Sequence, residues 1–495
     1  MGTIRRQSIQ STLLFTAGIG LAFFLRLVVF PKYLTTDELG LLTVLLDSAN
    51  LFAAFIPLGG QRILVRYLPY FERKTRGYES FPSVVIGLSA IGCVIFMMLF
   101  ALFYDPIRDY YSQKAPLLSK VVFLIVPLTL SRVMYTMSAF YALSQKRNVF
   151  SNFLSEILIR ILTAGIVMIY AHSFFSVTGL SILYVGIYFF TAAWMLSYSL
   201  KNKKLRFSVF KKPNLKSEVN RPVVIYGLLS AVTTGTTVIT KNIDSIMITS
   251  LASLSSAGIY SIPFFIGMLI EVPKRAVSQI TAPFIAESLA TNDTVKIKSL
   301  YQKTALNQLI IGSITLLCVW VNIDYVFDII PNGETYAAGK YVVLIIGISK
   351  IIDMATGSNR EIIQNSPYYK TNLYLMLFLG IATIGLNILL IPKLGIEGAA
   401  ITQVIIILIL NVVNSVIIKL KYNIIPFTLK TLYVPVFITV VYMLVKVLPT
   451  TDFSVLNILT NSAVAVITFA VLLLISKTSE DVNILFKQVV GRIKK

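Results

Sequence analysis

The sequence contains few of the residue types on which enzyme and metal sites depend. Among its 495 residues are two cysteines and one histidine, and only 13% of the residues are charged. Cys93 and Cys318 both fall within long apolar stretches, so they indicate neither a disulfide framework nor a metal cluster. His172 follows such a stretch, where an interfacial side chain is expected.

Motifs for nucleotide hydrolysis and for catalysis are also missing. Residues 333–340 (GETYAAGK) have five residues instead of four between the glycines and no hydroxyl residue after the lysine, so they are not a phosphate-binding loop. No long extracytoplasmic loop is predicted that could house the active site of a polymerase or ligase. The sequence therefore predicts a protein that is not an enzyme and has no catalytic residues, metal or cofactor.

Apolar residues dominate what is present. Hydrophobic residues make up 56% of the chain and the mean hydropathy is +0.79, which excludes a soluble protein. A bilayer core about 30 Å thick requires about 20 apolar residues per helix. The sequence predicts an all-α polytopic membrane protein with about fourteen spans, near 9–31, 39–60, 81–104, 116–143, 149–171, 177–200, 222–249, 255–285, 305–327, 338–357, 371–392, 395–418, 428–448 and 455–476.

The first six spans are repeated by the next six. Gly40 aligns with Gly258, and Arg132 aligns with Lys350, at the same offset of 218 residues. Two modules with six spans each have the same orientation, which predicts a parallel pseudo-two-fold repeat around a cavity that opens alternately to either side. The predicted organisation is an N-lobe (1–200), a basic linker (201–221), a C-lobe (222–418), two further spans (428–476) and a tail (477–495).

Basic residues are distributed unevenly between the connections. There are 44 lysines and arginines against 22 acids, a formal net charge of +22. Thirty of the basic residues lie in one set of connections and termini, and five in the opposite set. This bias predicts that both termini are cytoplasmic, and it explains the charge without nucleic-acid binding. The linker 201–221 is then a solvated segment near anionic headgroups.

Charged residues within the spans are the candidate functional groups. Each costs about 2.5–3.5 kcal/mol on insertion scales, so such a residue needs a reason to be there. Spacings of three or four residues predict local ion pairs for several of them. These pairs are Glu156–Arg160, Glu271–Lys274, Glu271–Arg275, Lys241–Asp244 and Lys350–Asp353.

Arg26 and Arg132 have no acid within reach in their own helices. A cavity lined by Arg132, Arg160 and Lys350 would be electropositive and would attract a phosphate or an acidic sugar. Arginine suits phosphate because its planar fork donates two hydrogen bonds. Arg26 aligns with Asp244 under the repeat, so it either pairs across the lobe interface or joins the substrate site.

Four segments carry a family resemblance. They are residues 16–69, the seventh span with its continuation NIDSIMITSLASLSSAGIYSI, the segment PNGETYAAGKYVVLIIG, and LNILLIPKLGIEGAAITQVIII across spans eleven and twelve. Together they resemble the bacterial oligosaccharide flippases, which translocate O-antigen and capsule repeat units and belong to the multidrug/oligosaccharidyl-lipid/polysaccharide exporter (MOP) superfamily. The likeness covers essentially the whole chain.

The resemblance implies a substrate and a mechanism. The substrate would be an oligosaccharide on undecaprenyl pyrophosphate, moved from the cytoplasmic to the periplasmic leaflet of the bacterial inner membrane by alternating access. The protein would act as a monomer alongside polysaccharide polymerase machinery. Sodium or protons would be the coupling ion. The positions that match a sodium site in lipid II flippase relatives are Asp244, Asn387 and Thr402, although Asn387 stands where those relatives can carry an acid.

Other functions stay open at this point. A lipid II flippase is a close variant, and a cation-coupled multidrug antiporter of the same superfamily is a second alternative. An exporter of organic cations favours an acidic cavity, whereas the first span here carries Arg26 and no carboxylate. Asn387 and Thr402 also have a simpler interpretation as polar contacts between helices.

Overall fold

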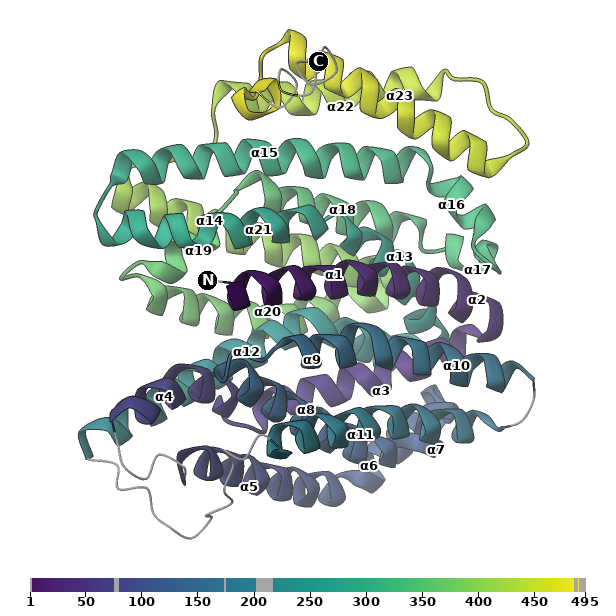
Figure 1. The fold of residues 1–495 in the computed structure, drawn as a ribbon. Coiled ribbons are helices and arrows are strands. Elements are labelled where there is room, and N and C mark those ends of the chain that lie inside the picture. The colour runs from purple at the N-terminus through teal and green to yellow at the C-terminus, as the bar shows by residue number, and fades with distance from the viewer. Residues whose placement is uncertain (1, 75–79, 173–174, 202–216, 485–487, 489–495) are drawn as a thin grey trace. The chain divides into compact units, whose positions relative to one another are not determined.

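The computed structural model describes residues 2–74, 80–172, 175–201, 217–484 and 488. These residues form helices and no strands, so the predicted all-α class is confirmed. The chain divides into two compact units, Met1–Ser261 and Ile262–Lys495. Their helices are labelled in Figure 1. The described residues exclude most of the predicted linker, at 202–216, and part of the predicted tail, at 485–487 and 489–495.

Unit 1 contains the first twelve α-helices and the start of the thirteenth. Two of its spans include a short π-helical stretch, η1 (Leu25–Val29) and η3 (Leu154–Leu158), and a third includes a 3-10 turn, η2 (Val122–Leu124). The α-helices are α1 (Gly2–Phe24), α2 (Phe30–Tyr33), α3 (Thr36–Phe55), α4 (Gly60–Lys74), α5 (Ser80–Leu102), α6 (Tyr104–Lys114), α7 (Pro116–Val121), α8 (Ile125–Ser144), α9 (Val149–Phe153), α10 (Ile159–Ala171), α11 (Val177–Lys201), α12 (Ser217–Leu251) and α13 (Leu254–Leu269).

Unit 2 contains the remaining helices and one 3-10 turn, η4 (Leu429–Leu432). Its α-helices are α14 (Val272–Ala290), α15 (Thr294–Val321), α16 (Ile323–Ile329), α17 (Gly333–Ala337), α18 (Lys340–Ala355), α19 (Asn359–Asn365), α20 (Tyr369–Leu394), α21 (Ile396–Tyr422), α22 (Tyr433–Lys446) and α23 (Ser454–Ile475).

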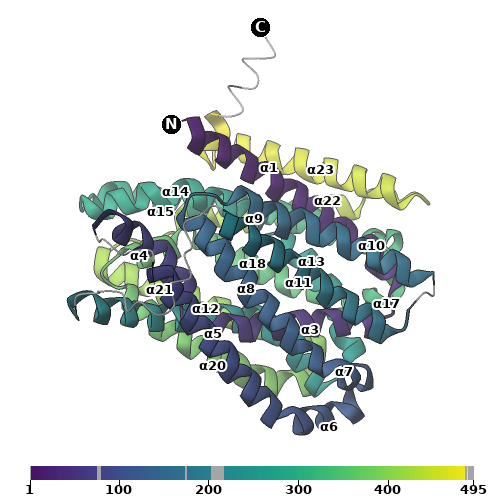
Figure 2. The ribbon, with the colours of Figure 1, turned by 60° about the horizontal axis from the view of Figure 1, so that its bottom comes forward.

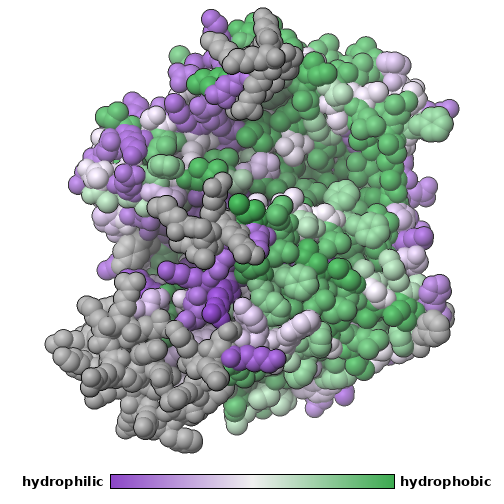
Figure 3. Space-filling model, in the orientation of Figure 1, coloured by the Kyte–Doolittle hydropathy of each residue, from purple (hydrophilic) through white to green (hydrophobic). Residues whose placement is uncertain are grey.

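The helices account for the predicted membrane spans. Among the described residues, twelve helices are long and apolar enough to cross a bilayer, and two bent pairs raise the number to fourteen. Hydrophobic residues cover the middle of the helices on the face drawn in Figure 3, and hydrophilic residues gather near helix ends. The chain is therefore a multi-pass membrane protein.

Both bent spans have a local cause. The pair α13–α14 bends by 45°, and the first turn of α14 contains Pro273, whose missing N–H and bulky ring disturb a helix that precedes it. The pair α18–α19 bends by 54° at Gly357, whose φ of +56° favours glycine. A Cβ atom at Gly357 would also lie 2.6 Å from the backbone nitrogen of Ala305.

The ends of the helices repeat with the chain. α2 ends at Tyr33 and α12 ends at Leu251, while α3 begins at Thr36 and α13 begins at Leu254; each pair is separated by 218 residues, the offset found in the sequence. α12 packs along α3 and α4 (Figure 2), which is why it belongs to unit 1.

Two repeat-related glycines allow a close helix crossing in unit 1. A Cβ atom on Gly40 would lie 2.1 Å from the carbonyl oxygen of Leu254, and one on Gly258 would lie 1.9 Å from that of Thr36. The contact is reciprocal, because Thr36 and Leu254 are themselves repeat mates. Small residues permit such approaches in membranes, where association depends on packing rather than on the hydrophobic effect.

The last two spans cover α15 in unit 2. Leu317 of α15, Val434 and Val441 of α22 and Phe469 of α23 belong to one buried cluster. Asn461 of α23 donates to Asn322, just after α15, at 3.1 Å. These contacts attach the two spans outside the repeat to unit 2.

Candidate functional site

Arg132 lies in the middle of α8 and faces two neighbouring helices of unit 1. Its Nε donates to Oδ1 of Asn50 on α3 at 2.8 Å. Its guanidinium also lies 5.8 Å from the centre of the Tyr188 ring on α11. Both groups are neutral, so they orient the guanidinium without cancelling its charge.

The Arg132 side chain lines a cavity of about 320 Å³ formed by α3, α4, α8 and α12. A second cation, Arg62, lines the same cavity. The other walls combine amide and hydroxyl groups with small apolar side chains and one phenyl ring. They are Asn50, Ala53, Ala54, Gln61, Thr136, Phe140, Thr234, Val238 and Asn242. The cavity thus offers two guanidinium groups and several hydrogen-bonding groups to an anionic, polar ligand.

Arg62 was not among the predicted site residues. It follows the predicted span 39–60 and was expected in a connection between spans, but this segment forms the helix α4, which begins at Gly60. Ile63, Leu64 and Leu68 are buried while Arg62 is exposed. The apolar residues Ile63, Leu64 and Leu68, set among arginines, are the signal in the sequence that could have identified the helix.

Arg160 is neutralised within its own helix turn. Its Nη1 lies 2.7 Å from Oε2 of Glu156, as the four-residue spacing predicted. The same nitrogen packs against Gly18 of α1, where an added Cβ atom would lie 2.5 Å away. Arg160 therefore contributes less positive charge to any substrate site than Arg132 does.

Two predicted local pairs in unit 2 are wrong. Lys350 pairs with Glu271 at 2.9 Å instead of Asp353, and Lys274 pairs with Asp353 at 2.6 Å instead of Glu271. The partners are exchanged because the start of α14 and the end of α18 approach one another beside the two bends. Glu271 also lies 3.8 Å from Arg275, as the sequence predicted.

The Lys274–Asp353 pair is buried within a polar network. The two side chains are 10% and 7% exposed. Asn411 on α21 donates to Oδ1 of Asp353 at 3.1 Å, and Oδ1 of Asn411 accepts bonds from Thr356 and Asn359. The network joins four helices of unit 2, α14, α18, α19 and α21, beside the bends.

Arg26 and Asp244 belong to a group of polar residues in unit 1. Asp244 is buried and accepts a hydrogen bond from the Tyr260 hydroxyl at 3.2 Å. Asp47 on α3 accepts a hydrogen bond from Ser245, and its carboxylate is attracted by Arg26 and repelled by Asp244. Asp47 was not among the predicted site residues, and the structure adds it to this group.

The other predicted site residues lie in unit 2. Asn387 on α20 and Thr402 on α21 are fully buried, and Thr402 donates to the carbonyl of Gly398 in its own helix at 3.1 Å. Asp244 belongs to unit 1, and Lys350 to the unit that does not contain Arg132. The shared ion site and the three-cation site stay predictions.

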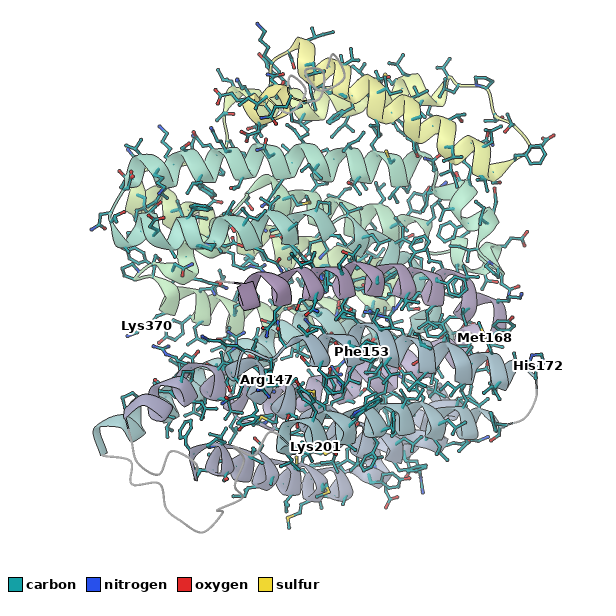
Figure 4. The ribbon with its side chains drawn as sticks, viewed as in Figure 1. Arg147, Phe153, Met168, His172, Lys201 and Lys370 are labelled. Carbon is teal, nitrogen blue, oxygen red and sulfur yellow. The ribbon has the colours of Figure 1, made fainter. Side chains whose placement is uncertain are left out.

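Among the described residues, no group of three or more histidine, cysteine or acidic side chains could hold a metal ion. Cys93 and Cys318 are free thiols in the structure. His172 lies beyond α10, at the end of unit 1 opposite to Arg147 and Lys201 (Figure 4).

Comparisons with known proteins identify the fold. No protein-family model and no curated protein sequence matches the chain. A lipid II flippase, MurJ in an inward closed conformation, has a TM-score of 0.70 at 12% identity and covers 94% of this chain and 98% of that one. An inward-facing multidrug MATE transporter of the MOP superfamily has a TM-score of 0.61 at 15% identity, with 83% and 94% covered. The multidrug transporter DinF-BH has a TM-score of 0.54 at 15% identity, with 86% and 96% covered. The chain therefore has the fold of these membrane transporters.

Proposed function

We propose that this protein is a flippase that moves undecaprenyl-pyrophosphate-linked oligosaccharide from the cytoplasmic to the periplasmic leaflet by alternating access. The observation that carries the proposal is the cavity lined by Arg132 and Arg62 within a membrane-transporter fold. A pyrophosphate is the part of such a lipid that needs cations, and its sugars need the amide and hydroxyl groups that surround them.

Arg132 is the residue that we assign to the pyrophosphate. Asn50 holds the guanidinium through Nε, which presents the two terminal nitrogens as a fork for phosphate oxygens. Arg62 adds a second charge in the same cavity. Arg160, Lys350 and Arg26 are weaker candidates, because Arg160 and Lys350 lie against carboxylates and Arg26 is close enough to attract one.

The test compares variants of Arg132 in a strain that lacks its own flippase, with surface polysaccharide measured at matched protein levels. Arg132→Ala is expected to lower export about ten- to hundredfold, because charge-assisted hydrogen bonds are worth about 1.5–3 kcal/mol. Arg132→Lys is expected to keep part of the export, since the charge remains without the fork. Arg108→Ala, an exposed arginine on α6, is the matched control. Full export by Arg132→Ala would exclude the assignment.

Two alternative functions, a lipid II flippase and a multidrug antiporter, are found on this fold. Two observations bear on the multidrug antiporter. The lipid II flippase covers more of the chain than the multidrug transporters do, and the cavity carries cations rather than acids. Both observations favour a flippase over an exporter of organic cations. Complementation of strains that lack a lipid II flippase, an oligosaccharide flippase or a multidrug exporter separates the three substrates.

The proposed transport also needs a driving force. We infer an ion gradient, with Asp244, Asn387 and Thr402 as the coupling residues, or product removal by a downstream polymerase. Asp244→Asn is expected to abolish the dependence of transport on the sodium or proton gradient. If this variant transports normally and keeps that dependence, Asp244 has a structural role only.

A further inference from the structure

Three side chains of α6 converge on the last turn of α12. The Tyr110 hydroxyl donates to the carbonyl oxygen of Ser250 at 3.1 Å, and Nζ of Lys114 donates to the same oxygen at 2.9 Å. The Tyr111 hydroxyl lies 2.7 Å from Oγ of Ser250. Lys114 also donates to the Tyr110 hydroxyl at 3.2 Å and lies 4.9 Å from the centre of that ring. These contacts join segments about 140 residues apart in the chain.

The chemistry of this contact fits the end of a helix. α12 ends at Leu251, so the Ser250 carbonyl is one of the last four that lack a partner within the helix. A lysine beside these carbonyls also interacts favourably with the helix dipole. Oγ of Ser250 donates to the carbonyl of Ile246 at 2.9 Å, which leaves it to accept from Tyr111. The Tyr111 hydroxyl is protonated at neutral pH like that of any tyrosine, and burial raises its pKa further.

Other contacts hold the start of α13, which follows this end of α12, against α3. The hydroxyls of Thr36 and Ser255 lie 2.7 Å apart, and Gly40 and Gly258 bring the two backbones together. The cavity is farther along the same helices. Its nearest α12 residue is Asn242, eight residues or about 12 Å from Ser250. One end of this part of unit 1 is therefore closed by contacts, and the cavity lies toward the other end.

We propose that α6 is a latch: its contacts with Ser250 hold the extracytoplasmic end of α12 in place while the transporter is closed on that side. These contacts break when the transporter opens to that side. The proposal rests on the proposed alternating access and on the predicted orientation, which places α6 outside the cytoplasm. Because the three α6 side chains bond to one residue, a small movement of α12 breaks all of these bonds together. The latch thus stabilises the conformation closed on that side and shifts the equilibrium between the two conformations.

Cysteine labelling tests the latch without any substrate. Asn242→Cys, in a chain whose Cys93 and Cys318 are replaced by alanine, is labelled with a membrane-impermeant maleimide in intact cells. Adding Tyr111→Phe and Lys114→Met is expected to raise the extracytoplasmic labelling rate about tenfold. The variants remove hydrogen bonds of ordinary strength that stabilise the conformation closed on that side. Ser112→Ala is the control, since Ser112 is on the same helix and bonds to Asp109. An unchanged rate, or a rise of equal size in inside-out vesicles, would overturn the latch.

A cross-link provides the complementary test. Oxidation of a Tyr111→Cys, Ser250→Cys double variant is expected to lower polysaccharide export at least tenfold, and a reducing agent is expected to restore it. Parent-level export by the cross-linked protein would show that α6 only caps α12. Failure of the latch can be distinguished from failure of the proposed function, because the labelling experiment gives its answer even if Arg132→Ala exports normally.

Discussion

At the scale of single residues, the charges in the spans of unit 2 are held by partners on neighbouring helices. Lys274 and Asp353 form a buried pair, whereas Glu271 has two cations beside it, Lys350 at 2.9 Å and Arg275 at 3.8 Å. Loss of Lys350 therefore leaves Glu271 with its ion pair to Arg275, whereas loss of Lys274 leaves the buried Asp353 with only the electrostatic attraction of Arg360.

This difference predicts unequal effects of two matched variants. Lys274→Met is expected to destabilise the protein by about 3–5 kcal/mol, because it removes the ion-pair partner of the buried Asp353 carboxylate. Lys350→Met should cost clearly less. Adding Asp353→Leu to Lys274→Met is expected to recover most of the loss. Thermal unfolding of the purified protein in detergent measures all three, and equal losses for the two single variants would contradict this account of the charges.

The same residues show what could be predicted from the sequence at this scale. The pairs Glu156–Arg160 and Glu271–Arg275 form as predicted, because a spacing of four fixes the reach within one helix. The partners of Lys274 and Lys350 could not be found in this way, since they depend on how α14 and α18 approach at their bends. Arg132 was identified by the absence of a local acid, but its orientation by Asn50 depends on packing between α8 and α3.

At the scale of helices, the number and order of spans could be predicted from hydropathy, and the repeat from the spacing of a few residues. The bends at Pro273 and Gly357 and the helical character of α4 and α6 were not predicted. Apolar length determines that a segment spans the membrane, whereas a bend depends on backbone conformation and on contacts that no window of hydropathy contains.

The glycine crossing in unit 1 gives a prediction at this scale. Gly40→Ala and Gly258→Ala are each expected to lower the melting temperature strongly or to prevent accumulation, because the new methyl group would overlap a backbone oxygen that cannot move without separating the helices. Gly87→Ala in α5 is the control, since a Cβ atom there meets nothing within 4 Å. The comparison is made by fluorescence-detected gel filtration during heating. Equal melting temperatures for all three variants would refute the crossing.

At the scale of the whole molecule, the proposed direction of transport depends on how the protein is oriented in the membrane. Both termini and the 201–221 segment are predicted to be cytoplasmic from the distribution of basic residues. Lys201→Cys at the end of α11 is then expected to react with an impermeant maleimide only after the cells are permeabilised. Arg108→Cys on α6 should react in intact cells. Labelling of the Lys201→Cys variant in intact cells would contradict the predicted orientation and, with it, the proposed direction of transport.

The central claim is that the cationic cavity binds and moves an anionic lipid-linked oligosaccharide. Its most direct test is reconstitution of the purified protein in liposomes with fluorescent undecaprenyl-pyrophosphate oligosaccharide, with transfer between leaflets followed by a membrane-impermeant quencher. We predict that the parent protein speeds transfer relative to empty liposomes and that Arg132→Ala lowers this rate about ten- to hundredfold, while Arg108→Ala transports like the parent. Transfer by Arg132→Ala at the parent rate, or no transfer by correctly folded parent protein under any ion gradient, would contradict the claim.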